Sequence, residues 1–447
     1  MKYVCFHKQV PGQSAVRAGR NSMSQKIAAV ASPPSAVLIA VLALLNAVTP
    51  FSIDMYLSAF PEMASEFGVS PSTIQLSLTT FLIGLAVGQL IIGTLSDRYG
   101  RRRPLIIGTV ACVAVSVACA VAPSIALLIG LRFAQGFCGA AGVVISRAVI
   151  ADRSRGSRAA RLFAVMMLIG VLAPITAPIL GGVIVTGFGW RAVFLALAVL
   201  NLATLLGVVL TVRESLSEEH RRPGGLKALG VSARTVLGNR HYLGYTLVMA
   251  FAAAAMFGYI SASPFVVQNI LGFSPAAYSV TFGSCALAVG AGSLISARLV
   301  RTVAPRRVLM GGVTALLVVA TLMLLNVTAG HVIGWATIAL MACFMGSIGF
   351  VYANATALAL GEVPRAAGTG SAVLGFLQYG MGAITPPLVG LAGQSSAVPM
   401  GLVMFGAATL AALSMFVLTR GHVPFGDEDD DAGDAPVTVS AGGTTSR

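Results

Sequence analysis

Two charged residues lie deep in apolar stretches of the sequence. Asp54, within Pro50-Phe-Ser-Ile-Asp54-Met-Tyr56-Leu, is the only carboxylate deep in any apolar run, and Arg132 is the only arginine at similar depth. A charge at the centre of a bilayer costs roughly 2.5 to 3.5 kcal/mol on insertion scales, so such residues need a reason to be there. A carboxylate in this setting can change between charged and neutral states as water or a ligand enters. We therefore predict that Asp54 binds protons and that Arg132 is its partner.

The stretch around Arg132 has the pattern of a helix with one polar or small face. Arg132, Gln135, Gly136 and Gly139 follow i, i+3, i+4, i+7 spacing, which places them on one side of a helix that should face the protein interior. Counting about 1.5 Å per residue puts Asp54 and Arg132 in the same, outer half of the membrane. The alternative is a permanent structural ion pair with no role in proton transfer.

A short basic segment, residues 93–105, separates two long apolar runs; we call it the hinge. It reads Gly93-Thr-Leu-Ser-Asp97-Arg98-Tyr-Gly100-Arg101-Arg102-Arg103-Pro-Leu. Its arginines should hold both flanking helices at the cytoplasmic face by the positive-inside bias. The alternative is an ordinary cytoplasmic loop whose arginines only orient the chain. That alternative does not explain why Gly93, Asp97 and Gly100 occur at these spacings. The pattern resembles the loop between helices 2 and 3 of the major facilitator superfamily.

A third pattern is a stripe of prolines and glycines, which lies at helical spacing in one apolar run. Prolines kink a transmembrane helix and glycines let a neighbouring helix approach closely. The stripe is therefore either part of the transport machinery or a close-packing face. Its residues are Gly170, Pro174, Pro178, Gly181 and Gly182.

Several amide and aromatic side chains lie in spans where lipid would exclude them, and we predict that they line a substrate cavity. For each aromatic residue the alternative is ordinary packing, and for the amides it is an interhelical hydrogen bond. The predicted cavity residues are Tyr56, Gln89, Gln135, Tyr259, Phe265, Asn354, Gln378 and Tyr379.

Composition defines the class of protein. The 447 residues are 56% hydrophobic and only 10% charged, which excludes a water-soluble globule and indicates an all-α integral membrane protein. A bilayer crossing needs about 20 apolar residues, and twelve runs satisfy this, near 36-58, 73-95, 104-123, 126-147, 162-186, 190-212, 241-263, 279-300, 307-328, 332-353, 369-391 and 397-419.

Basic residues fall in loops on one side of these twelve runs, with Arg191 the exception. Both termini are then expected to be cytoplasmic. The net charge of +14 should meet anionic lipid rather than nucleic acid, because the basic residues occupy short loops between apolar runs. We expect an N-terminal tail over 1-35, six-helix bundles over 36-212 and 241-419, a linker over 213-240, and a disordered acidic tail over 420-447.

The two halves resemble each other weakly, as after a duplication. Arg102-Arg103-Pro-Leu has a counterpart in Arg306-Arg307-Val-Leu, and transporters built from such repeats bind substrate between them. No metal-ligand cluster is evident, so no metal is expected. No nucleotide-binding glycine loop occurs either, so neither a bound cofactor nor ATP drive is expected.

Longer segments resemble the Bcr/CflA group of drug/proton antiporters, which includes bicyclomycin and chloramphenicol exporters. They are Ile53-Asp54-Met55-Tyr56-Leu57, Ser146 to Arg153, Ala173 to Gly182, Gly189 to Phe194, Ile260 to Phe265 and Ala367 to Ala372. The resemblance implies proton antiport through Asp54 and Arg132. It also implies a conformational lock in which Asp97 and Arg98 of the hinge act with Asp152.

The combined expectation is a monomeric, proton-driven multidrug exporter of the bacterial inner membrane, with the major facilitator fold and small amphipathic drugs as substrates. One alternative is the same fold moving a metabolite, sugar or amino acid. Another is a membrane-embedded enzyme, which is disfavoured because no nucleophile and base pair lies in the spans.

Overall fold

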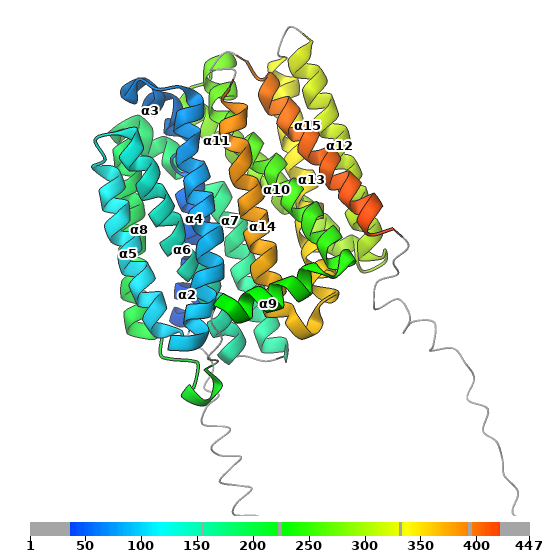
Figure 1. Cartoon of the computed structure of the whole chain (residues 1–447). Helices are drawn as coiled ribbons and strands as arrows, with labels where there is room; N and C mark the ends of the chain where they lie inside the picture. Colours follow the sequence, from blue (N-terminus) through cyan, green and yellow to red (C-terminus); the bar gives the residue numbers. More distant parts are fainter. Residues whose placement is uncertain (1–35, 154–155, 222–225, 330–332, 392–395, 421–447) are drawn as a thin grey trace, which may run out of the picture.

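The computed structural model describes residues 36–153, 156–221, 226–329, 333–391 and 396–420, and every regular element in these ranges is helical (Figure 1). The predicted tail over 1-35 and nearly all of that over 420-447 lie outside the described residues.

The first bundle contains a long helix interrupted near its end, followed by five further helices. The interrupted helix is α2 (Ala36–Asp54), continued by the short η1 (Leu57–Ala59) and α3 (Phe60–Phe67). The others are α4 (Pro71–Tyr99), α5 (Arg102–Ala120), α6 (Ile125–Arg153), α7 (Gly156–Phe188) and α8 (Trp190–Thr211).

The second bundle repeats this arrangement. It contains α10 (Arg240–Phe265) with the π-helical η3 (Val266–Ile270), α11 (Pro275–Leu299), α12 (Pro305–Thr328), α13 (Gly334–Gly361), α14 (Ala367–Val389), and α15 (Val398–Leu413) continued by η5 (Ser414–Leu418). Short turns η2 (Glu218–His220) and η4 (Pro364–Ala366) lie in connections.

Within the described residues, eleven helices are long and apolar enough to cross a membrane, and the apolar part of α7, Leu172–Phe188, supplies the twelfth. The predicted all-α membrane fold of two six-helix bundles is confirmed.

Local sequence explains where matching helices of the two bundles begin. Ser70 and Ser274 precede Pro71 and Pro275, and each serine side chain accepts a hydrogen bond from the backbone N–H three residues later, at 3.3 and 3.2 Å. Both prolines occupy the first helical turn, where the missing N–H costs nothing. α4 and α11 thus start by the same device, which supports the duplication inferred from the sequence.

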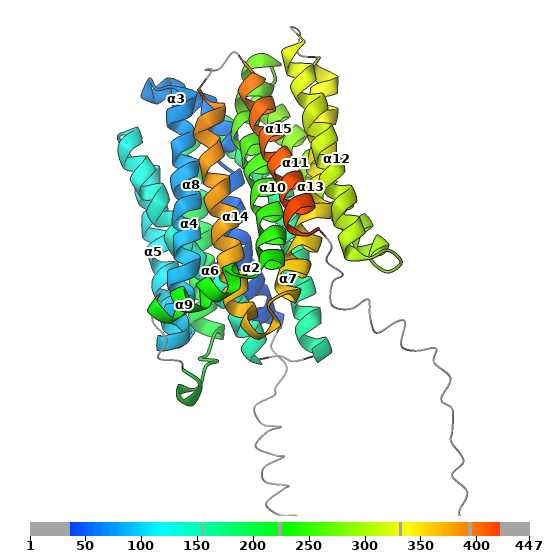
Figure 2. The same ribbon diagram turned by 45° about the vertical axis from the view of Figure 1, so that its right-hand side comes forward.

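The linker between the bundles includes a helix of its own, α9 (Leu226–Leu237). Figures 1 and 2 show α9 lying across the ends of α4 and α14, nearly perpendicular to them. This end of the molecule also carries the hinge, and we call it the hinge end. The opposite end, which carries α3, is the far end.

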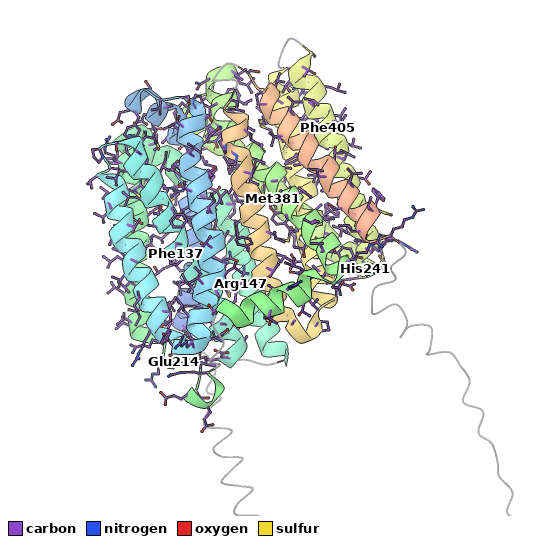
Figure 3. All side chains as sticks on the ribbon, viewed as in Figure 1. Phe137, Arg147, Glu214, His241, Met381 and Phe405 are labelled. Atoms are coloured by element: carbon purple, nitrogen blue, oxygen red, sulfur yellow. The ribbon has the colours of Figure 1, made fainter. Side chains whose placement is uncertain are left out.

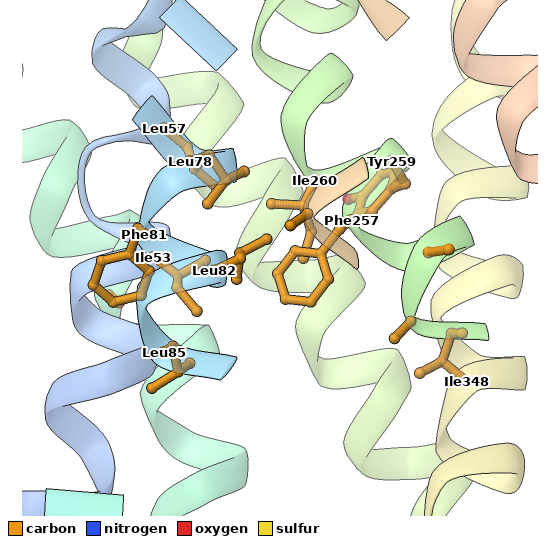
Figure 4. Close-up of a cluster of buried hydrophobic side chains, with 14 of the residues drawn as sticks. Ile53, Leu57, Leu78, Phe81, Leu82, Leu85, Phe257, Tyr259, Ile260 and Ile348 are labelled. Atoms are coloured by element: carbon orange, nitrogen blue, oxygen red, sulfur yellow. The ribbon is translucent and has the colours of Figure 1, made fainter. Parts of the chain in front are cut away.

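Apolar side chains of both bundles meet between them. Figure 4 shows Ile53, Leu82 and their neighbours of the first bundle facing Phe257 and Ile260 of the second. The two bundles therefore share one buried core where they meet. We call this boundary between the bundles the seam.

Candidate functional site

A cavity of about 310 Å³ lies between the two bundles. One wall comes from α2, α6 and α7, and the other from α10, α11, α13 and α14. Most of its lining is apolar, including Pro50, Ile53, Met256, Phe257, Phe282 and Ile348. Its size lies at the lower end of the range of drug-binding pockets.

The charged residues among the described lining are Asp54 and Arg147, and neutral polar residues such as Asn46, Gln378 and Tyr379 accompany them. Asp54 is 4% exposed, and Met55, Tyr56 and Leu57 beyond it are buried. Arg147 is exposed, and Figure 3 places it between the level of Phe137 and that of Glu214 at the hinge end. The cavity is therefore sealed toward the far end and opens toward the hinge end.

Arg132 is fully buried and is not part of the cavity lining. Its guanidinium carbon lies 4.2 Å from the ring centre of Tyr56 and 4.3 Å from that of Phe81. Its nitrogens donate to Gln135 Oε1 at 2.5 Å and to the backbone oxygen of Ser52 at 2.9 Å. Aromatic faces and hydrogen bonds together stabilise a cation that has left water.

The predicted ion pair between Asp54 and Arg132 is not present: in the part of the chain that the structure describes, no ion pair joins these two side chains. The pair does not form because α2 ends at Asp54. The last backbone carbonyls of α2 therefore have no N–H donor within the helix. Arg132 caps one of these, that of Ser52, where a cation is favoured by the helix dipole. Asp54 instead faces the cavity.

At the hinge, Arg101 is the central residue. It is 8% exposed, and it donates to Asp97 Oδ1 at 2.5 Å, to Ser96 Oγ at 2.7 Å and to Asp152 Oδ2 at 3.1 Å. The structure thus brings together three residues predicted from the sequence. The other predicted arginines lie apart from this group, since Arg98 stacks on Tyr99 and Arg102 donates to the Val209 backbone.

Sequence reasoning missed Glu214, which holds the hinge in shape. Its carboxylate accepts the backbone N–H groups of Arg101 at 2.8 Å and Arg102 at 3.1 Å, at the start of α5, and those of Ser215 and Leu216. Partial burial raises the pKa of Glu214, but these four donors outweigh it and hold the pKa below its usual value. Gly100 has a φ of +88°, and a Cβ there would lie 2.5 Å from Glu214 Oε2. A glycine at 100 is therefore needed for both its backbone conformation and its space.

At the far end, neutral hydrogen bonds join the two bundles. Ser72 Oγ donates to the Pro387 carbonyl at 2.9 Å, Gln75 Nε2 to that of Ser261 at 2.9 Å, and Thr79 Oγ1 to that of Ala383 at 2.8 Å. Gln268 of the second bundle donates through Nε2 to the backbone carbonyl of Ser58 in the first bundle, at 3.1 Å. These contacts close the seam between the bundles at this end.

The Pro/Gly stripe of α7 contributes to the same closure. Gly181 lies against the backbone of Met55, and Gly182 lies against Ser279 of α11, so closely that a Cβ at either position would overlap its neighbour. Gly170 and Pro174 line the cavity, whereas Pro178 is buried and not part of its lining. The stripe is thus a close-packing face that also borders the cavity.

Of the eight predicted cavity residues, the structure places Gln378 and Tyr379 in the lining. The other six lie elsewhere. Tyr56 and Gln135 contact Arg132, and Gln89 lies against Gly375. The ring of Tyr259 stacks on that of Phe282, and the ring centres of Phe265 and Phe60 are 6.2 Å apart. Asn354 donates a hydrogen bond to Ser296 Oγ. These six side chains therefore contribute to helix packing and to hydrogen bonds between side chains. Asn46, Arg147 and Tyr352, which line the cavity, were missed, and a polar residue inside an apolar run was the available signal.

The sequence matches the profile of the Major Facilitator Superfamily over residues 42–386, and the chain belongs to that family. Solved transporters share its fold. A bacterial homolog of the human lysosomal transporter Spinster, solved in an inward-facing, unoccupied conformation, superposes with a TM-score of 0.68 at 18% identity, covering 87% of this chain and 98% of that one. A D-xylose-proton symporter gives 0.67 at 16% identity, covering 87% and 100%.

Among curated proteins, the chain is 37% identical to a Bacillus subtilis protein named Uncharacterized MFS-type transporter YdgK, over 87% of this chain and 96% of that protein. It is 29% identical to the bicyclomycin resistance protein homolog of Haemophilus influenzae, covering 87% and 97%. It is 26% identical to the multidrug resistance protein MdtL of Klebsiella pneumoniae, covering 85% and 95%. The resemblance to drug transporters of the major facilitator superfamily, first drawn from sequence motifs, is confirmed.

Proposed function

We propose that this protein exports small amphipathic drugs, of chloramphenicol or bicyclomycin type, in exchange for protons. The observation that carries the proposal is a largely apolar cavity between the two bundles into which Asp54 projects. Drug-resistance relatives of nearly the same length support the substrate class.

The proposed cycle uses the two ends of the seam in turn. In this conformation the cavity opens toward the hinge end, where a drug enters and Asp54 gives up its proton. The far end then separates while the hinge end closes, with Asp97, Arg101 and Asp152 as the lock. Protonation of Asp54 from the far side releases the drug, as alternating access between two repeats requires.

We further propose that the hinge end is cytoplasmic, because the hinge concentrates arginine and the positive-inside bias then orients the chain. Both termini are then cytoplasmic, the protein acts as a monomer, and its drug substrates leave through the inner membrane of the cell.

Transport of a sugar or another metabolite by the same fold is the second candidate. A saccharide site needs many hydrogen-bonding groups, whereas Met256, Phe257, Phe282 and Ile348 make much of this cavity apolar. The drug proposal is therefore favoured.

The test is expression in a host that lacks its own efflux pumps, followed by a susceptibility panel of neutral and charged antibiotics. We expect raised resistance to a subset of amphipathic compounds, and loss of drug export when an uncoupler collapses the proton gradient. Unchanged susceptibility to every compound, with the protein present in the membrane, would contradict the proposal.

A further inference from the structure

Arg147 is a charged cavity residue that the proposed cycle does not use. It projects from α6 into the cavity wall. Within the described residues, neither the ion pairs nor the hydrogen bonds include its guanidinium, in contrast to Arg101, Arg191 and Arg221, which each contact a carboxylate. Its donors are available to a ligand that enters from the hinge end.

The two charges of the cavity lie at different depths. Gly142 of α6 packs on the backbone of Leu45 in α2, which places these residues at one level. Asp54 lies nine positions beyond Leu45 toward the far end, and Arg147 lies five positions beyond Gly142 toward the hinge end. At about 1.5 Å per residue their backbones are about 20 Å apart along the seam. Both side chains nevertheless line one cavity, so the carboxylate marks its closed end and the guanidinium its open end.

The cavity wall between these two charged residues is apolar. Phe257, Phe282, Met345 and Ile348 of the second bundle face Pro50 and Ile53 of the first. A ligand that fills this space therefore meets a carboxylate, then an apolar middle, then a guanidinium.

We infer that the preferred substrates are elongated amphipathic zwitterions, with a basic group toward Asp54 and a carboxylate or similar anionic group toward Arg147. This inference rests on the proposed export function and ranks zwitterions above neutral drugs of chloramphenicol or bicyclomycin type among the exported compounds. A simple cation would leave the guanidinium unpaired and be repelled by it at the entrance. A simple anion would be repelled by ionised Asp54. A zwitterion satisfies both ends, and the planar guanidinium fits a carboxylate with two parallel hydrogen bonds.

The test uses the purified protein and two fluorescent probes, norfloxacin and its methyl ester. Norfloxacin carries a carboxylate at one end and a secondary amine at the other, and the ester removes the anionic charge alone. We expect the wild-type protein to bind norfloxacin about tenfold more tightly than the ester, as one charge-assisted contact allows. Arg147→Gln should remove this preference by weakening norfloxacin binding only, and Arg147→Lys should keep part of it. The matched control is Arg298→Gln, which removes an exposed charge at the end of α11, outside the described cavity lining.

Unchanged affinity of Arg147→Gln for the ester also shows that the variant is folded. Equal wild-type affinity for the two probes would overturn the inference without any variant. If Arg147→Gln lowers the affinities for norfloxacin and for its methyl ester equally, the inference is also overturned. The arginine would then affect the shape of the cavity and would not bind the carboxylate of norfloxacin. If neither probe binds, the zwitterion inference fails, whereas uncoupler-sensitive export of neutral drugs in the susceptibility panel decides the proposed function separately.

Discussion

The two ends of the seam between the bundles are built from different interactions. At the far end, Ser72, Gln75 and Thr79 donate to backbone carbonyls of the second bundle, and Gly182 packs directly on Ser279. At the hinge end, Arg101 forms ion pairs with Asp97 and Asp152, and all three residues belong to the first bundle.

The type of interaction at each end determines how that end can open and close. Neutral hydrogen bonds and glycine contacts act only at short range, so the far end must fit closely or separate. Half-exposed charges act over longer distances and respond to salt and protonation. We therefore expect the far end to be sensitive to added volume and the hinge end to loss of charge.

The largest effect should follow a change at the carboxylate beside the closed end. Asp54→Asn should leave the protein inserted but abolish drug export against a gradient, because an amide cannot take up and release a proton. Uptake of drug from the external buffer into energised everted membrane vesicles provides the measurement. Glu219→Gln, which alters an exposed carboxylate of the linker, is the control and should transport normally. Uphill export by Asp54→Asn would remove Asp54 as the coupling site.

Arg132→Lys should be the next most damaging change. An ammonium keeps the charge but lacks the planar fork that reaches Gln135 and Ser52 while stacking on two rings, so we expect transport to fall about tenfold or more. Initial rates in the same vesicles measure it. Arg191→Lys, at an exposed arginine of the far end, serves as the matched change. Wild-type rates in Arg132→Lys would mean that any cation suffices there.

Added volume tests the short-range nature of the far end. Gly182→Val should prevent close approach of α7 and α11 and shift the population about tenfold toward the conformation open at that end, which corresponds to about 1.4 kcal/mol. Single cysteines placed along the seam, in a background without native cysteines, report accessibility from either side. Gly187→Val is the control, because a Cβ at 187 meets no atom within 4 Å. Identical labelling in the two variants would argue against a close-fitting far end.

Loss of charge tests the hinge end and should shift the same equilibrium by a similar amount in the opposite direction. Asp97, whose carboxylate is half-exposed, contacts Arg101 in this conformation. We expect it to reach the free amides at the start of α14 when the hinge end closes. Asp97→Asn should then favour the hinge-open state by about 1 to 2 kcal/mol, with drug binding retained and turnover lowered. The same cysteine labelling measures this shift, with Glu218→Gln as the control. If labelling is unchanged while transport is lost, Asp97 matters for folding or insertion instead.

The positions of the helices and the all-α membrane class can be read from the amino-acid sequence. Runs of about 20 apolar residues can cross a bilayer only as helices, since backbone groups have no water to bind there. Local signals such as Ser70-Pro71 and Ser274-Pro275 also locate helix starts, because the capping atoms lie within one turn of each other. The chemical types needed at the hinge were readable for the same reason.

Which polar groups contact each other depends on the tertiary fold. Depth along the helices predicts that Arg132 pairs with Asp54. In the structure α2 ends at Asp54, and Arg132 instead donates to the free backbone carbonyl of Ser52. Glu214 reaches the hinge from more than 100 positions along the chain. Arg147 became a cavity residue because α6 faces the seam at that turn. Such contacts depend on helix rotation and on the approach of distant segments, which hydrophobic patterning leaves open.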